Sequence, residues 1–437
     1  MKRIYEPAAY AEHSGRFWET TMPAQDWQVL NTNLNVDVAI IGGGFTGLNA
    51  ALGLAQSGLN TAVFEAMSPA WGASGRNGGF CCLGGSMLPQ KHMRKRFGDA
   101  ATDDWHKVQI ASIHHVQSLL TDHSIDVDAH SQGETCVAHS ARAWRAMQSE
   151  ATEIETHYGL SPTLIPKNDL AQTGLGGPWH GAMTTPIGFA LNPQKYHNGL
   201  AQLAQGAGVP LFGQSPITAL CPSDTGWTLT SGPHTITAKR IVLATNGYSS
   251  DDLPDWIGAR YLPVQSSIIL TRPLSQDEQQ AAGWWSSQMV YDSRQLLHYF
   301  RLLPDGRFMF GMRGGLRATP AAQAKIDRKI RSDFNKMFPA WAHVDITHEW
   351  SGLVSLMSDL VPFVGPMPDH PGLFAAMGYH GNGVAMSSYC GHLLVQHMIK
   401  NQPLPKVLRQ PPKRMPLGRY RRYLLAPAYS ISELFDL

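Results

Sequence analysis

The sequence predicts an α/β plus α+β fold. A Rossmann-like domain, assembled from separated parts of the chain, is joined to a second domain built on a mixed or antiparallel β-sheet that carries helices. Three observations predict this fold. Residues 37–65 read as strand, glycine turn, helix and strand, and residues 261–317 are rich in strand pattern. Residues 373–399 read as another strand, glycine turn and helix.

The first unit has the pattern of a dinucleotide-binding βαβ motif. Residues 38–41 are a continuous apolar run, as expected for a strand covered on both faces. Gly42, Gly44 and Gly47 follow in Gly-x-Gly-x-x-Gly spacing, which permits a tight turn, close approach to a pyrophosphate and packing of the next helix. Glu65 comes roughly 20 residues later, where a carboxylate accepts from ribose hydroxyls. The motif alone does not choose between NAD and FAD.

The middle of the chain alternates helices and short strands. Apolar spacing predicts helices over 104–120 and 141–158, the second ended by Gly159. Asn192 followed by Pro193 predicts the start of a helix that ends near Gly206. We expect strands over 209–212 and 240–248 and a hairpin-like segment over 226–231.

The 261–317 segment predicts an antiparallel hairpin. Its arms, 296–303 and 307–312, flank Pro304-Asp305-Gly306, which is a strong turn signal. Strand alternation places Tyr299 and Arg301 on one face of the first arm. An amphipathic helix is expected over 320–338.

Composition describes an ordinary globular protein. The chain has 437 residues, 43% hydrophobic and 16% charged, enough for two domains. A net charge of +2 is too small to suggest nucleic acid, and five cysteines make a disulfide framework unexpected. We predict no metal site, no signal peptide and no membrane span, and a cytoplasmic location. The adjacent Cys81 and Cys82 are interpreted as reduced and inert, with redox activity as the alternative.

Four separated motifs together resemble one family. They are Ile40–Gly47 with Glu65, the loop Trp71–Gly79, Ala244–Tyr248 and Gly378–Val384. The chain resembles the D-amino-acid-oxidase-like FAD oxidoreductases across most of its length, and within them the γ-glutamylputrescine oxidase branch. The cofactor that the resemblance implies is therefore FAD.

The resemblance implies where FAD lies. The ADP half would lie on the first βαβ unit, and the loop 74–79 would pass under the flavin ring. The turn at 378–383 would begin a helix whose dipole faces the pyrimidine edge of the flavin. The implied cofactor-binding residues are Gly42, Gly44, Phe45, Thr46, Gly47, Glu65, Ala66, Trp71, Ser74, Gly75, Arg76, Asn77, Gly78, Gly79, Ile217, Thr245, Asn246, Gly247, Gly378, His380, Gly381, Asn382, Gly383 and Val384.

The family chemistry is oxidation of a carbon–nitrogen single bond in an amine or amino acid. Hydride passes to flavin N5, water hydrolyses the imine, and O2 takes the electrons to give hydrogen peroxide. One alternative is a flavoenzyme that oxidises a side chain of a partner protein during maturation of a protein-derived quinone cofactor. Another is an amino-acid dehydrogenase that delivers electrons to a quinone.

Two departures from the family pattern bear on the cofactor. The sarcosine oxidase branch attaches flavin through a cysteine that residues 351–365 lack, so we predict non-covalent FAD. Where that branch has an oxygen-activating lysine, this chain has Met309, which keeps the dehydrogenase alternative open. The basic tail could then make a peripheral membrane contact, against the alternative of a tail packed along the fold.

Four residues are candidates for the reaction: Tyr299, Arg301, Arg313 and His380. An arginine near the flavin's open face can pair bidentately with a substrate carboxylate. The alternative for each arginine is a solvated or structural role, and for His380 a capping or core role.

We expect four regions along the chain. They are an N-terminal surface arm (1–35), an FAD-binding domain (36–95, 190–255 and 350–400), a substrate domain (96–189 and 256–349) and a basic C-terminal tail (401–437).

Overall fold

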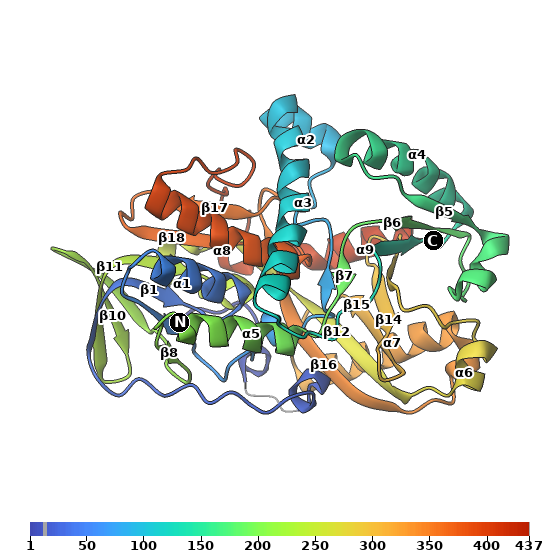
Figure 1. Cartoon of the computed structure of the whole chain (residues 1–437), viewed down its shortest axis with the longest axis horizontal. Coiled ribbons are helices and arrows are strands. Elements are labelled where there is room, and N and C mark those ends of the chain that lie inside the picture. Colours follow the sequence, from blue (N-terminus) through green and yellow to red (C-terminus); the bar gives the residue numbers. More distant parts are fainter. Residues whose placement is uncertain (12–14, 437) are drawn as a thin grey trace.

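The computed structural model describes residues 1–11 and 15–436, so residues 12–14 of the predicted arm and Leu437 of the predicted tail lie outside it. In this part of the chain the fold is organised around two eight-stranded sheets that lie side by side (Figure 1). The predicted fold class is confirmed.

The first sheet contains the predicted βαβ unit. β1 (Leu34–Ile41) lies at its centre, parallel to β2 (Thr61–Phe64) on one side and to β11 (His234–Leu243) on the other. The remaining strands are β17 (Phe363–Pro366), β18 (Leu373–Met377), β8 (Leu211–Phe212), β9 (Ala219–Ser223) and β10 (Gly226–Ser231). Because β1, β2 and β11 are parallel, their carboxyl ends meet at one edge of the sheet, where ligands bind in such folds.

In the described residues four helices cover this sheet, and one of them, α3 (Asp99–Asp122), falls in the range that the sequence assigns to the substrate domain. The other three are α1 (Phe45–Gln56), α5 (Pro193–Gly206) and α8 (Gly383–Lys400). Trp105, Ile113 and Val116 of α3 share one apolar core with α1 and α8. The stretch from residue 96 therefore begins on the Rossmann-like side, because the apolar face of α3 is buried there.

The second sheet is long and mixed. Its order is β16 (Ile346–Met357), β12 (Tyr261–Pro273), β15 (Arg307–Arg313), β14 (His298–Leu302), β13 (Met289–Asp292), β4 (Glu134–Val137), β6 (Gly181–Thr185) and β5 (Thr163–Pro166). The hairpin of β14 and β15 agrees with the predicted arms, whereas β16 extends this sheet into residues we had assigned to the first domain. β16 pairs with β12 over its whole length, and this pairing takes it to the second sheet.

Smaller elements complete the second half of the molecule. Phe300 of β14 and Phe308 of β15 pack against α7, the predicted helix over 320–338, in an aromatic core. The other elements are α2 (Gln90–Phe97), α4 (Ala141–Tyr158), α6 (Gln276–Ala281), α7 (Pro320–Met337) and the short pair β3 (Phe80–Cys81) and β7 (Phe189–Ala190).

The N-terminal segment turns its aromatic side chains into the fold. Its aromatic residues Tyr5, Tyr10, Phe17, Trp18 and Trp27 are buried. The Trp18 indole N–H donates to the carbonyl of Asn77 at 3.0 Å. Large apolar rings gain by burial, so these side chains anchor the segment on the fold, in part through the loop at 71–79.

The C-terminal tail packs on the fold. It ends in α9 (Leu425–Phe435), preceded by a short helical turn at Gly418–Leu424. Arg421 has no exposed surface and forms an ion pair with Asp251 at 2.6 Å. Arg422 pairs with Glu6 at 2.9 Å. These contacts favour the packed-tail alternative over a membrane contact.

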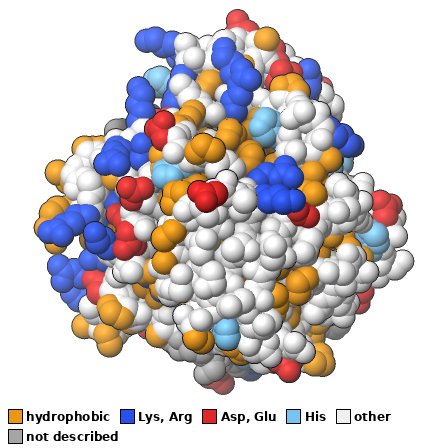
Figure 2. All heavy atoms as spheres, turned by 90° about the vertical axis from the view of Figure 1, so that its left-hand side faces the viewer, with side chains coloured by type: hydrophobic (Ala, Val, Ile, Leu, Met, Phe, Trp, Pro, Cys, Tyr) orange, Lys and Arg blue, Asp and Glu red, His pale blue; other side chains and the backbone are white. Residues whose placement is uncertain are grey.

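The exposed charges are mixed in sign. Figure 2 shows one face of the molecule, on which Lys and Arg side chains are scattered among acidic and neutral ones. None of the helices in the described residues is long and apolar enough to span a membrane.

Candidate active site

One cavity of about 430 Å³ runs between the two sheets. The separated motifs that the sequence singles out meet around it. The predicted residues that line it are Gly42, Gly44, Phe45, Thr46, Glu65, Ala66, Trp71, Ser74, Arg76, Asn77, Gly78, Ile217, Thr245, Asn246, Tyr299, Arg313, His380, Gly381, Asn382, Gly383 and Val384. Gly47, Gly75, Gly79, Gly247, Gly378 and Arg301 are not among its lining residues.

The glycine turn after β1 forms one end of the cavity. Gly42 has φ +105°, which favours glycine, and a side chain there would meet the carbonyl of Ala244 at 2.8 Å. α1 begins directly after Gly44, so its first N–H groups and positive dipole end face the cavity. The N–H of Phe45 donates to Ser74 Oγ at 3.0 Å. This end therefore has the geometry that holds a pyrophosphate.

Glu65 lies at the end of β2 beside that turn. Its carboxylate accepts from the N–H of Gly43 at 2.9 Å and from the N–H of Met67 at 3.0 Å. The side chain is half-buried and lines the cavity. Glu65 thus holds the turn in shape and has a carboxylate at the position where a ribose is bound in such folds.

The loop 71–79 is braced by its own side chains. The Arg76 guanidinium donates to the carbonyls of Trp71 at 2.6 Å and Ser351 at 2.8 Å. Asn77 accepts from the N–H of Gly79 at 2.8 Å. These contacts leave Gly78 at the cavity wall, where a Cβ would meet the Tyr299 ring at 2.9 Å. The loop therefore approaches the second sheet by its backbone.

The third motif turns from β18 into α8. Gly378 has φ +82°, and its N–H donates to the Asn246 amide oxygen at 2.9 Å. Gly381 has φ +105°, and a Cβ there would lie 2.5 Å from an Arg313 nitrogen. The turn therefore brings the N-terminus of α8 against the end of β15.

His380 is held on both sides by backbone groups. Its Nδ1 lies 2.9 Å from the carbonyl of Gly85, and its Nε2 accepts from the N–H of Met357 at 3.1 Å. Burial lowers the pKa of His380 to about 4, so the ring is neutral near pH 7. These contacts favour the core-histidine alternative over a catalytic role.

Arg301 lies away from the cavity although it shares a sheet face with Tyr299. Its guanidinium donates to the carbonyl of Leu191 at 2.8 Å and lies 3.0 Å from His130 Nε2. It has no exposed surface, and burial lowers its pKa to about 9. The loop at Gly79 covers it, so the structure favours the structural alternative for Arg301.

Arg313 and Tyr299 do face the cavity. Among the described residues, none accepts a hydrogen bond or forms an ion pair with the Arg313 guanidinium, and burial lowers its pKa. The Tyr299 hydroxyl lies 3.0 Å from Ser266 Oγ. Burial raises the pKa of Tyr299 to about 12, so the phenol stays neutral near pH 7. Arg313 is therefore available to an anionic ligand.

The sequence did not indicate four polar residues that also line the cavity: Glu134, Ser266, Tyr291 and Ser355. They lie on four different strands of the second sheet, and their convergence depends on long-range strand pairing. An acidic residue two positions before the apolar pair Cys136 and Val137 is the one local signal that marks Glu134.

The cavity residues fit an FAD molecule. In the described part of the chain, the Trp71 indole N–H and the Ser355 hydroxyl are buried without a hydrogen-bond partner, and both line the cavity. Buried polar groups normally have partners, so these two donors are free for a ligand. The glycine backbone at 42–44 and 78 gives the close approach that a cofactor requires.

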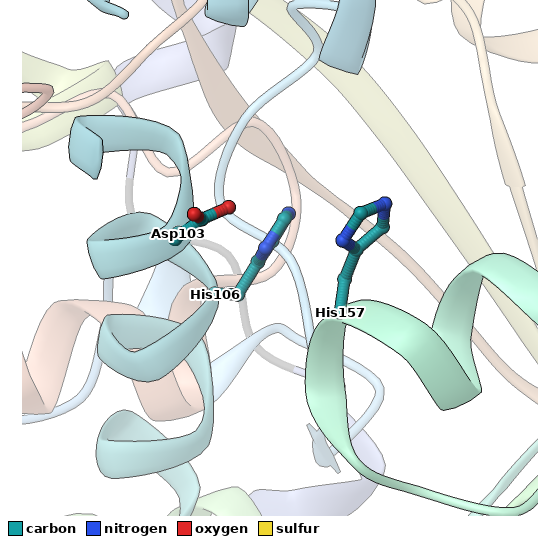
Figure 3. A group of neighbouring side chains, drawn as sticks. All are labelled: Asp103, His106 and His157. Atoms are coloured by element: carbon teal, nitrogen blue, oxygen red, sulfur yellow. The ribbon is translucent and has the colours of Figure 1, made fainter. Parts of the chain in front are cut away.

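A separate cluster has the residue types of a metal site. Asp103 and His106 on α3 and His157 at the end of α4 point toward one another, with one ligating atom of each within 4.8 Å of the others (Figure 3). The Arg94 guanidinium donates to Asp103 at 3.1 Å and lies 3.5 Å from His157 Nδ1. A metal ion would have to displace Arg94, and the cluster does not line the cavity.

Known proteins share this sequence pattern. The family model described as DAO, FAD dependent oxidoreductase, matches residues 37–397. A probable oxidoreductase, OrdL, of Rhizobium meliloti (strain 1021) is 29% identical over 383 residues, 87% of each chain. The gamma-glutamylputrescine oxidoreductase of Escherichia coli (strain K12) is 25% identical over 376 residues, 85% of each chain.

Solved structures share the fold. Glycine oxidase from Geobacillus kaustophilus aligns with a TM-score of 0.69 at 19% identity, over 85% of this chain and 96% of that one. L-proline dehydrogenase from P. horikoshii aligns with a TM-score of 0.69 at 17% identity, over 90% of this chain and 99% of that one. At these identities the likeness concerns the fold alone.

Proposed function

This chain belongs to the DAO family of FAD-dependent oxidoreductases, and we propose that it oxidises a carbon–nitrogen bond of a small amine or amino acid that carries a carboxylate. The observation that carries the proposal is Arg313, a cavity arginine without an anionic partner in the described residues. Relatives named for an amine or amino-acid substrate, such as gamma-glutamylputrescine oxidoreductase, support the same class of reaction.

FAD, when bound, would supply the acceptor for a hydride, that is one proton and two electrons, from the carbon beside nitrogen. The side chains around the cavity bind and orient the substrate. Arg313 pairs with the carboxylate in a fixed fork geometry. The Tyr299 ring packs on the Gly78 loop and its neutral hydroxyl donates or accepts one hydrogen bond. With these groups fixed, the rate depends mainly on how the reacting carbon is positioned.

We propose that FAD is held without a covalent bond. The cavity is lined by one cysteine among the described residues, Cys82, and burial raises the pKa of its thiol well above the ordinary value. A protonated thiol is a poor nucleophile. Acid precipitation of the holoenzyme should leave yellow flavin in the supernatant, whereas flavin retained on the polypeptide would contradict non-covalent binding.

We propose O2 as the electron acceptor, with a quinone as the alternative. The observation that favours the alternative is Met309, which is fully buried beside Gly78 and brings no positive charge to that position. Aerobic turnover distinguishes the two. An oxidase forms one hydrogen peroxide for each substrate oxidised. A dehydrogenase forms none, and it turns over only when a quinone is added, which it reduces to the quinol.

The proposed reaction is tested with purified holoenzyme and a panel of amines and amino acids, mixed without oxygen. Substrates of the proposed class should bleach the flavin, and carboxylates that lack nitrogen should not. The proposal would be wrong if no amine or amino acid in the panel bleached the flavin, while dithionite reduced the same flavin readily.

A further inference from the structure

Glu134 is a buried carboxyl group in the wall of the active-site cavity. It is the first residue of β4 and is 6% exposed. Burial raises its pKa to about 8, and hydrogen bonds from the Cys82 thiol and the Leu83 backbone oppose this rise. No sequence motif or family resemblance assigns it a role.

The groups around Glu134 bring no positive charge. The groups that interact electrostatically with Glu134 are thiols, phenols and one carboxyl. They lie on the segment at Cys82, on β4, on β13 and on α4. They are Cys81, Cys82, Cys136, Tyr158, Tyr291 and Glu150. Among the described residues, no lysine, arginine or histidine lies within ion-pair distance of Glu134. A buried carboxylate without a cation is costly, so this position favours a ligand that supplies one.

Glu134 and Arg313 lie on the same face of the second sheet. Tyr291 of β13 pairs with Tyr299 of β14 and with Cys136 of β4, and Tyr299 pairs with Gly311 of β15. Glu134 precedes Cys136 by two residues and Arg313 follows Gly311 by two, so both side chains leave the sheet on this face. The shared cavity lies there.

The two charged groups stand far apart on that face. β4 and β15 are separated by β13 and β14, which makes three strand spacings. At about 4.8 Å for each spacing, the two strands lie about 14 Å apart across the sheet. The side chains span part of that distance, and the rest is left for a ligand.

We propose that Glu134 binds a cationic nitrogen of the substrate while Arg313 binds its carboxylate. The substrate class is then an elongated ω-amino carboxylate, with ammonium and carboxylate separated by several bonds. An α-amino acid, with one carbon between its charges, is too short to reach both groups. This inference rests on the proposed oxidation of a carbon–nitrogen bond and specifies its substrate.

The pairing has a defined pH dependence. Glu134 is mostly protonated below pH 8, because its pKa is raised to about 8. Binding of an ammonium favours the carboxylate, so binding releases a proton at neutral pH. The affinity for ω-amino carboxylates therefore rises as pH increases through about 8, until the ligand's own ammonium deprotonates near about 10.

The test compares holoenzyme with the variants Glu134→Gln and Glu153→Gln. Glu153 is an exposed carboxyl on α4 outside the cavity, and its variant is the matched control. The probes are ω-amino carboxylates of increasing chain length and the plain carboxylates of the same lengths. Binding is read from the perturbation of the flavin absorbance, and turnover from anaerobic bleaching.

The wild type and E153Q should prefer one ω-amino chain length over its plain carboxylate, and the preference should grow with pH. E134Q should lose about tenfold or more of that preference, as expected for a hydrogen bond to a charged group. Its affinity for plain carboxylates should be unchanged. An E134Q variant that keeps the preference and its pH dependence would overturn the proposal.

A second variant separates substrate binding from folding. Glu134→Asp keeps the charge on a shorter side chain, so the preferred ligand should become longer by one methylene. A merely structural role would leave the preferred length unchanged. If the preference persists in binding but no amine bleaches the flavin, the substrate inference stands and the proposed oxidation fails.

Discussion

At the scale of single residues, environment decides what an arginine does. Arg301 and Arg313 come from paired strands of one hairpin and project from the same sheet face. Arg301 donates to a protein carbonyl and lies beside His130, whereas Arg313 has no such partner in the described residues and lines the cavity. Strand alternation predicted that Arg301 shares a face with Tyr299, and the pairing of β14 with β15 adds Arg313 to that face. The sequence pattern could not predict which of the two arginines the loop at Gly79 would cover.

Arg313→Gln should weaken the binding of carboxylate ligands by about 2 kcal/mol, which is about thirtyfold, because a charge-assisted hydrogen-bonded pair is lost. Titration of the flavin absorbance with a carboxylate measures the change. The methyl ester of the same ligand should bind both proteins equally. Equal carboxylate affinity in wild type and variant would exclude Arg313 as the anion-binding group.

At the scale of elements, the N-terminus of α1 depends on close packing. A Cβ on Gly44 would lie 2.8 Å from Ser74 Oγ. Gly44→Ala should therefore displace Ser74 into the cofactor's space and weaken flavin binding by about 1–3 kcal/mol. Gly206, with no atom within 4 Å of its Cβ position, is the control. Its alanine variant should bind flavin normally, and a normal flavin content in Gly44→Ala would contradict the assignment of the α1 N-terminus.

Two N-cap residues differ in the number of other hydrogen bonds that their side chains form. Asn192 caps α5 and also donates to Thr21 at 3.0 Å and Asp128 at 3.1 Å. Ser140 caps α4 through one bond to Ala143. Ser140→Ala should lower the free energy of unfolding by about 1 kcal/mol. Asn192→Ala should lower it by about 2 kcal/mol or more, since further hydrogen bonds are lost. Urea denaturation measures both, and equal losses would show that the extra bonds contribute nothing.

The elements that the sequence predicted well are those specified by local signals. The βαβ unit at 36–65, the helix capped by Asn192 and the hairpin around Gly306 all rest on neighbouring residues. The placement of β4 beside β13 joins residues more than 150 positions apart, and no local pattern predicts such a pairing. Glu134 was missed for that reason. The burial of Trp18 and Trp27 was missed because it depends on contacts with distant loops.

At the scale of the whole molecule, buried histidines couple stability to pH. Burial lowers the pKa of five histidines to about 4. They are His106, His115, His130, His197 and His380. In the unfolded chain a histidine titrates near about 6.5, so between about pH 6.5 and 4 the unfolded state binds more protons. The free energy of unfolding should therefore fall on acidification through this window.

Three groups oppose that trend. Hydrogen bonds to Asp292 and Asp333 overcome the effect of burial and raise the pKa of His298, and burial raises the pKa values of Glu134 and Glu150, so all three favour the folded state at lower pH. The more numerous histidines should dominate. Melting temperatures measured in steps from pH 7 to 4 should decline, and a constant or rising melting temperature would contradict the neutral, buried state of these rings.

The central claim is that this FAD-dependent oxidoreductase acts on a carbon–nitrogen bond. The most direct measurement mixes holoenzyme, without oxygen, with an ω-amino carboxylate and separately with the hydroxy carboxylate of the same chain length. Flavin absorbance near about 450 nm is followed in both. We predict that the amine bleaches the flavin and that the alcohol does not. Bleaching of the flavin by the alcohol would contradict the account. So would the absence of bleaching by either compound at every chain length, if dithionite bleaches the same flavin fully.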